Sequence, residues 1–176
     1  MDFINASFDI QLLPRAEEVP LTPIQRAYLT VIRIEWAISS TILLILGAVL
    51  IFSIKALQQP VYISLIAGGW IILTVGYAFI QAKSFFQKAY ALRDKDVIYR
   101  SGWLVQKIKT CPFNRIQHSS VTTGLFERKF GLATLILYTA GTDDADLSIP
   151  GLKEADATAM KEWITQKIID EEQRRT

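Results

Sequence analysis

The chain has almost none of the residues on which metal and redox chemistry depend. Among its 176 residues there is one cysteine, Cys111, and one histidine, His118. A lone cysteine forms neither an intramolecular disulfide nor a cysteine-based metal site, and a lone histidine excludes a histidine cluster. The sequence therefore predicts no catalytic residues, no metal site and no cofactor, and the single cysteine suits a reducing, cytosolic compartment.

An excess of charge of one sign is also missing. The 19 Lys and Arg residues nearly balance the 17 Asp and Glu residues, which leaves a net charge of +2. Nucleic-acid binding is therefore not indicated by bulk charge, and no glycine-rich phosphate-binding motif is present. A basic site, if there is one, has to be local.

Charge is nearly absent from residues 36 to 82, where Lys55 stands alone. Two apolar runs result, Trp36–Ile54 and Val61–Ile80. Each is close to the roughly 20 residues that cross a hydrocarbon core of about 30 Å at 1.5 Å per residue. The segment Lys55–Pro60 between them allows only a tight turn, so we predict a transmembrane hairpin of two antiparallel helices.

The distribution of basic residues predicts the orientation of this hairpin. Its turn carries only Lys55, whereas both outer flanks are basic, through Arg26, Arg33, Lys83, Lys88, Arg93, Lys95 and Arg100. Short basic flanks stay in the cytoplasm. We therefore expect a multi-pass protein of the bacterial plasma membrane with both termini cytoplasmic: an N-terminal segment (1–35), the hairpin (36–82) and a cytoplasmic domain (83–176).

Two local patterns precede the hairpin. Alternating Phe8, Ile10 and Leu12 permit one short strand. Thr22 and Gln25 fit a capping box, in which the Thr22 hydroxyl accepts a hydrogen bond from the Gln25 backbone NH and the Gln25 side chain accepts one from the Thr22 backbone NH. Pro23 suits the first helical position, because its missing NH would be unpaired there anyway. This pattern predicts that the first helix starts at Thr22.

Small residues interrupt both apolar runs and allow helices to approach closely. They are Gly47, Ala48, Ser64, Ala67, Gly68, Gly69 and Gly76. The interpretation that we favour is packing within the hairpin. The alternative is oligomerisation through Ser64 and Gly68, a small-xxx-small pair.

After Lys83 the sequence changes to short alternating segments separated by turn residues, which is typical of strands. The expected strands are 90–92, 97–100, 103–110, 115–123, 132–139 and 146–149. A helix over 153–172 follows, with Ala157, Met160, Ile164 and Ile168 on one apolar stripe that Trp163 widens. This order predicts a small antiparallel barrel or sandwich that the C-terminal helix closes.

Several motifs in this region closely resemble those of the bacterial pleckstrin-homology (PH) domains of the type 2 family. They are the segments 112–118, 124–132, 139–141 and 149–152, within a resemblance that covers about Tyr90 to Ile169. Members typically carry the domain after a two-span hairpin, and the resemblance implies two orthogonal antiparallel sheets capped by a C-terminal helix. Ser119 and Ser120 depart from the family pattern, which more often has an apolar residue followed by an acidic or polar one.

Some residues in these motifs are candidates for contacts or for special backbone geometry. We interpret Gly124 and Gly131 as structural, supplying backbone conformations that a side chain would strain. Basic side chains are the candidate contacts for a partner or lipid: Lys107, Lys109, Arg115, Arg128 and Lys129. Lys107 and Lys109 fall on one face of a strand.

The sequence therefore indicates a non-enzymatic membrane protein, a membrane α-helical hairpin plus a mainly-β PH-like domain. The function that we expect is protein–protein assembly at the cytoplasmic membrane face, with a second copy or another membrane protein as the partner. The alternative is binding of anionic lipid through the basic strand residues, each worth about 1 kcal/mol near an anionic surface.

Overall fold

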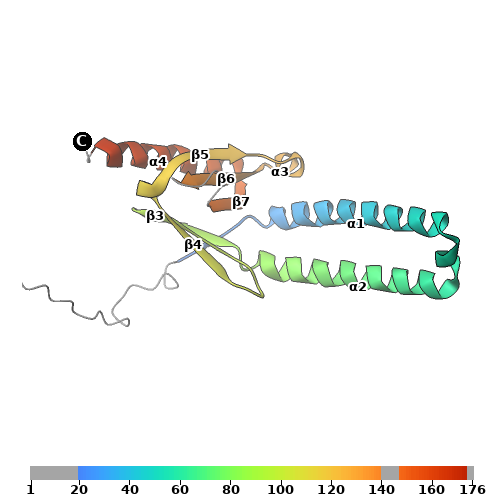
Figure 1. Cartoon of the computed structure of the whole chain (residues 1–176). Helices are drawn as coiled ribbons and strands as arrows, with labels where there is room; N and C mark the ends of the chain where they lie inside the picture. Colours follow the sequence, from blue (N-terminus) through green and yellow to red (C-terminus); the bar gives the residue numbers. More distant parts are fainter. Residues whose placement is uncertain (1–19, 140–146, 174–176) are drawn as a thin grey trace, which may run out of the picture.

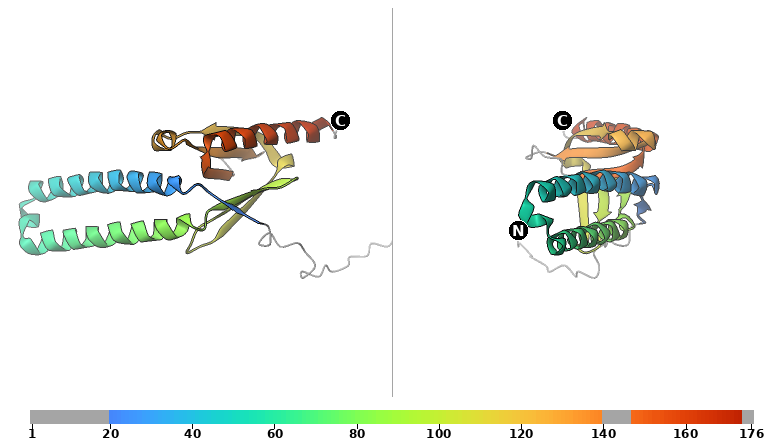
Figure 2. Two further views of the ribbon diagram at one scale, coloured as in Figure 1. Left: turned by 180° about the vertical axis from the view of Figure 1, so that it is seen from behind. Right: turned by 90° about the vertical axis from the view of Figure 1, so that its right-hand side faces the viewer.

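The computed structural model describes residues 20–139 and 147–173. A long helical hairpin projects from one end of a β domain (Figure 1). The expected strand over residues 8–12 lies outside the described residues. In the two further views, α1 of the hairpin lies on the side of the later strands and α2 on the side of the earlier ones (Figure 2).

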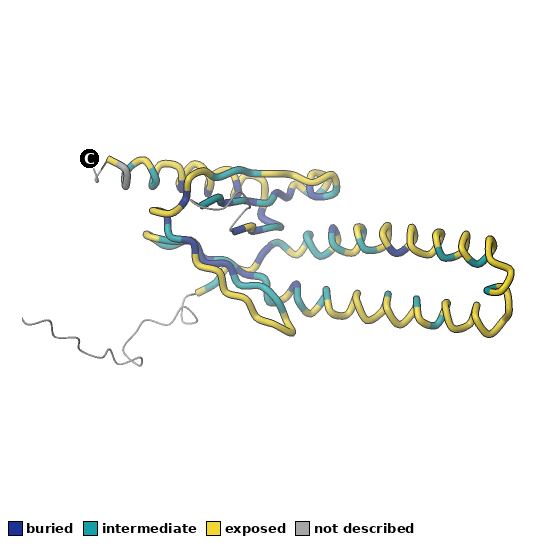
Figure 3. The backbone as a smooth tube through the Cα atoms, in the orientation of Figure 1, coloured by how far each residue is buried: buried dark blue, intermediate teal, exposed yellow. Residues whose placement is uncertain are grey.

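The hairpin consists of α1 (Ala27–Ser53), a 3-10 turn η3 (Lys55–Gln58) and α2 (Pro60–Phe85). Each helix is about 40 Å long at 1.5 Å per residue. Both helices are long and apolar enough to cross a membrane. Their surfaces are exposed along nearly the whole length, as Figure 3 shows. The expected run Val61–Ile80 falls inside α2, and the run Trp36–Ile54 ends one residue after α1. Both helices continue for several residues toward the β domain.

The predicted helix start at Thr22 is wrong. Thr22 and Pro23 form a short strand, β1 (Thr22–Pro23), which pairs with β2 (Ala89–Leu92) directly after the hairpin. The helix begins at Ala27 with no side-chain cap. Pairing with an existing strand supplies tertiary contacts that outweigh a local cap, and proline is tolerated there because β1 is an edge strand.

The β domain has two antiparallel sheets, as expected. The first has the order β1-β2-β3-β4, with β3 spanning Asp96–Ser101 and β4 spanning Lys107–Pro112. The second has the order β5-β6-β7, with the bounds Ile116–Thr122, Leu132–Thr139 and Leu147–Lys153. A 3-10 turn, η4 (Phe113–Arg115), connects the sheets, and α4 (Glu154–Gln173) follows β7.

Two local features differ from the expected strands. The β3–β4 loop (Gly102–Gln106) is a turn where a strand was expected from residue 103. Gly102 has φ +89°, a conformation outside the strand region, and therefore ends β3. A five-residue helix, α3 (Leu125–Lys129), was not predicted, because one turn is too short to show helical periodicity.

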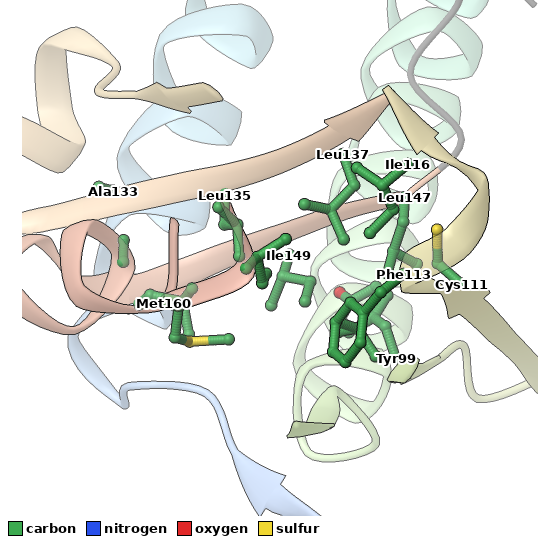
Figure 4. Close-up of a cluster of buried hydrophobic side chains, with 14 residues drawn as sticks. Tyr99, Cys111, Phe113, Ile116, Ala133, Leu135, Leu137, Leu147, Ile149 and Met160 are labelled. Carbon is green, nitrogen blue, oxygen red and sulfur yellow. The ribbon is translucent and has the colours of Figure 1, made fainter. Parts of the chain in front are cut away.

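The core lies between the two sheets and α4 (Figure 4). Phe113 from η4 is 1% exposed, and its ring meets Trp163 of α4 edge to face at 5.4 Å. The predicted stripe on α4 is confirmed, since Ala157, Met160 and Ile164 are all buried. The remaining members of the core come from both sheets, among them Val97, Tyr99, Cys111, Ile116, Leu135, Leu137, Leu147 and Ile149.

The departure at Ser119 leaves a polar atom inside the domain. Ser119 pairs with Leu137 of β6, and its hydroxyl oxygen is buried without a hydrogen-bond partner among the described residues. An unsatisfied buried hydroxyl costs roughly 1–3 kcal/mol. The apolar residue that the PH pattern prefers at this place would avoid that cost.

Candidate functional site

Lys107 and Lys109 lie at the start of β4, and both are exposed. Their strand partners are Ser101 and Tyr99, and alternation puts both lysines on the face of β4 that also carries Cys111. The prediction that the two lysines share a face is confirmed. Burial, together with the Tyr28 hydroxyl of α1, raises the pKa of Tyr99.

Arg128 and Lys129 are exposed on α3, which packs against α1. The helix start is fixed by Glu127, whose carboxylate accepts hydrogen bonds from the Gly124 backbone NH and from the Thr134 hydroxyl, each at 2.8 Å. Glu127 is buried, and both of its carboxyl oxygens have hydrogen-bond partners, as buried polar groups normally do. Its role is therefore structural, and the two basic side chains are held on a rigid turn.

The five basic candidates do not form one patch. Strand β4 begins at Lys107 beside the hairpin and runs away from it to η4, which contains Arg115 (Figure 1). Six residues of strand span roughly 20 Å. Lys107, Arg128 and Lys129 share the hairpin end of the domain, meaning the end from which α1 and α2 project. Arg115 lies at the opposite, far end and cannot join them in a single contact.

More basic residues gather at the hairpin end. The Lys83 ammonium lies 5.7 Å from the centre of the Phe79 ring, and the Lys88 ammonium lies 5.4 Å from the centre of the Tyr28 ring. Burial lowers the pKa of Lys88, because the charged ammonium group loses part of its hydration. Aromatic faces compensate in part for the lost hydration of such cations.

A cleft of about 300 Å³ separates the domain-proximal ends of α1 and α2. Glu35, Trp36, Gln81 and Lys88 are among the residues that line it, and Gln81 donates a 2.5 Å hydrogen bond to the Tyr77 hydroxyl, which also lines it. Ser39 also lines the cleft, and its hydroxyl donates a 2.9 Å hydrogen bond to the backbone carbonyl of Glu35, the bond of an ordinary helical serine. Among the described residues, no group of three His, Cys, Asp or Glu side chains could hold a metal ion.

His118 stacks on Tyr138 of the neighbouring strand, with ring centres 4.2 Å apart and an interplanar angle of 15°. Both residues belong to the sheet formed by β5, β6 and β7. The imidazole therefore covers an aromatic neighbour, which agrees with a structural role.

The two glycines singled out in the sequence differ. Gly131 has φ +62°, so the prediction of a strained conformation is confirmed there. Gly124 has φ −70°, which any residue adopts, and the same prediction is wrong for it. A Cβ at Gly124 would lie 3.3 Å from a carboxylate oxygen of Glu127, so this glycine instead allows the close approach of the capping carboxylate.

A third glycine joins the hairpin to the β domain. Gly151 of β7 has φ +70°, and its carbonyl accepts a 2.9 Å hydrogen bond from the backbone NH of Gln25. A Cβ at this position would lie 2.7 Å from Cβ and Cγ of Tyr28. The sequence contained a signal for this joint, a glycine directly after Pro150 inside a strand, but not the identity of the segment packed on it.

The glycines of the hairpin do not pack inside it. The two helices meet near the β domain, where the Trp36 and Tyr77 rings stack at 4.1 Å and the Ser40 and Thr74 hydroxyls lie 3.4 Å apart. For each hairpin glycine, an added Cβ would meet no neighbouring segment within 4 Å among the described residues, and this holds for Gly47, Gly68, Gly69 and Gly76. The favoured interpretation of packing within the hairpin is therefore wrong for these glycines.

Comparisons with known proteins find one family model and one similar solved structure. A family model described as "Bacterial PH domain" matches residues 31–168, which include most of the hairpin as well as the β domain. A crystal structure of a DUF1696 family protein with a pleckstrin-homology domain, from Shewanella loihica PV-4, is similar over 46% of this chain and 70% of that chain. It has 20% sequence identity and a TM-score of 0.37. Among curated proteins no match is found.

Proposed function

Because the chain belongs to the bacterial PH domain family, we propose that it is a membrane-anchored, non-enzymatic PH module that mediates protein–protein assembly at the cytoplasmic face of the plasma membrane. Its hairpin is the anchor, and its partner is a second copy or another membrane protein. The proposal combines two arguments, one on the anchor and one on the assembly surface.

The connections between hairpin and domain support the anchor. Strand β1 precedes α1 and pairs with β2, which follows α2. The chain thus enters and leaves the hairpin at the same end of one sheet, so a spanning hairpin keeps residue 20 and the β domain on one side of the membrane. Lys83 and Arg33 stand at that end and only Lys55 at the tip, a distribution that favours the cytoplasm for the domain.

Open glycines on α2 carry the assembly proposal. Ser64, Gly68 and Gly76 fall on one side of the helix, and an added Cβ at either glycine would meet no other segment within 4 Å among the described residues. In a bilayer, small residues favour close helix pairing through backbone contact. A surface left unfilled within one copy therefore fits a helix from another chain.

Gly68→Leu is expected to weaken this assembly by about tenfold, since a large side chain prevents close backbone approach. The monomer should keep its fold, because the added side chain enters open space. The measurement is crosslinking in native membranes followed by copurification, which also identifies the partner.

Ala48→Leu is a matched control, because it places a large apolar side chain at an exposed position of α1. It should leave the crosslinked fraction unchanged. Equal crosslinking of the parent chain and Gly68→Leu would contradict assembly through α2.

A second candidate function, binding of anionic lipid by the basic residues, is favoured by the position of Lys107, Arg128 and Lys129 at the hairpin end. In an anchored protein this end faces the lipid headgroups, where each basic side chain contributes about 1 kcal/mol. Arg115 would not take part, since it lies at the far end.

A further inference from the structure

The β3–β4 loop has an unusual composition for a hairpin turn. Its tip consists of Trp103, Leu104 and Val105, which are 38%, 72% and 67% exposed. Turns on a water-facing surface normally carry polar residues, and adjoining exposed apolar side chains mark a contact surface. No acidic residue occurs from Gly102 to Thr110.

The loop is folded into a defined shape. Gly102, with φ +89°, starts the turn, and a Cβ there would lie 2.1 Å from the carbonyl oxygen of Val105. The backbone therefore folds back tightly on itself, a close approach that only glycine permits. The apolar tip is a built feature of the sheet and not a loose end.

The loop lies against the hairpin. The Trp103 ring meets the Phe79 ring of α2 edge to face, with centres 5.8 Å apart. Phe79 is next to Ile80, the last residue of the apolar run, so the indole sits at the level where that run ends. Figure 1 shows the β3–β4 turn beside the domain-proximal end of α2. Tryptophan is enriched at this level of a membrane protein.

Two basic side chains lie near the apolar tip. Lys107 follows the loop and is exposed, and the Lys83 ammonium lies over the face of the same Phe79 ring that Trp103 contacts. Long basic side chains keep their ammonium groups at the phosphate level while their stems cover apolar surface. The apolar tip therefore matches the acyl-chain side of a bilayer interface, and the neighbouring lysines match its phosphate side.

We propose that the β3–β4 loop inserts Trp103, Leu104 and Val105 into the interfacial layer of the bilayer and so docks the β domain on the lipid surface. This inference rests on the proposed membrane anchoring of the hairpin. The occupant is lipid because the tip adjoins the exposed apolar surface of α2 through the contact between Trp103 and Phe79. The β domain then has two attachments, hairpin and loop, and its far end with Arg115 faces the cytoplasm.

Single cysteines in the full chain test this docking. On a Cys111→Ala background, Leu104→Cys reports the tip, Asn114→Cys the far end and Leu73→Cys the middle of α2. All three positions are exposed in the isolated chain, so folding should be preserved. Each variant is purified, carries an environment-sensitive fluorophore attached in detergent, and is reconstituted into vesicles of phosphatidylethanolamine and phosphatidylglycerol.

Docking predicts a blue-shifted fluorophore at position 104 that shallow lipid-borne quenchers reach, a water-like signal at position 114, and deep quenching at position 73. A second measurement uses vesicles that contain the cysteine variants without a fluorophore. A membrane-impermeant maleimide should modify Leu104→Cys about tenfold more slowly than Asn114→Cys, because a thiol in an apolar layer is less ionised.

The outcomes separate the two proposals. A water-like signal at position 104 with deep quenching at position 73 overturns the docking and leaves the anchor intact. A water-like signal at position 73 overturns the anchor and the docking together. Protection of position 104 in native membranes that is absent from the vesicles assigns the loop to a protein partner and overturns the lipid assignment.

Discussion

Gly151→Ala is expected to lower the free energy of unfolding of the β domain by about 2–4 kcal/mol, combining backbone strain with overpacking. The strain follows from φ +70° and the overpacking from a Cβ placed 2.7 Å from Tyr28 Cβ. Tyr28 Cβ is fixed to the backbone of α1, so the whole helix start has to shift. Urea denaturation of the full chain in detergent, followed by circular dichroism, measures the change.

Gly131→Ala is the matched control for this prediction. Gly131 has a similar φ of +62°, but an added Cβ meets nothing within 4 Å among the described residues. It should cost only the backbone strain, about 1 kcal/mol. Equal losses for the two variants would mean that the contact between Gly151 and α1 does not hold the hairpin against the domain.

Phe113→Ala is expected to cost about 3–5 kcal/mol, the range for deleting a buried aromatic ring. Phe113 is 1% exposed and lies where the first sheet, the second sheet and α4 meet. Its loss removes the contact with Trp163 and leaves a cavity. A small domain has little stability to lose, so the melting temperature should fall steeply.

The neighbouring variant Asn114→Ala should change the stability little, because Asn114 is exposed. Similar melting temperatures for Phe113→Ala and Asn114→Ala would contradict a core centred on η4. The burial of Phe113 also gives a physical reason for the family motif at 112–118, because Phe113 is the core residue of the turn that connects the two sheets.

The sequence predicted those elements whose signals are local and repeated. The stripe of Ala157, Met160 and Ile164 recurs at helical spacing, and α4 has its expected extent within two residues. Strand β6 has the expected bounds, and the ends of β5 and β7 differ from the expected ones by one to four residues. Periodicity works here because each such element buries one face.

Long-range packing decided the features that the sequence did not reveal. Thr22 carries a good capping signal, but its backbone pairs with Tyr90, a residue on the far side of the hairpin in sequence. The apolar side chains of Trp103, Leu104 and Val105 have strand propensity, but Gly102 turns the chain before them. A linear pattern contains neither the pairing nor the turn.

The candidate site was predictable in kind but not in arrangement. Basic residues were recognised individually, and Lys107 and Lys109 do share a face. Their separation from Arg115 depends on the direction of β4 relative to the hairpin, which only the topology gives. The contact between Gly151 and Tyr28 connects residues more than a hundred positions apart, so the sequence around one of them could not predict that it packs against the other.

The topology of the hairpin in a living bacterium tests the central claim most directly. Reporter fusions at the N-terminus and after Thr176 should both be active only as cytoplasmic reporters, and a reporter inserted at Gln58 in η3 should give the opposite, external signal. This result is expected because the hairpin spans the membrane and the chain leaves and re-enters the β domain at the same end. A cytoplasmic signal at Gln58, or an external signal after Thr176, would contradict the membrane-anchored cytoplasmic PH module.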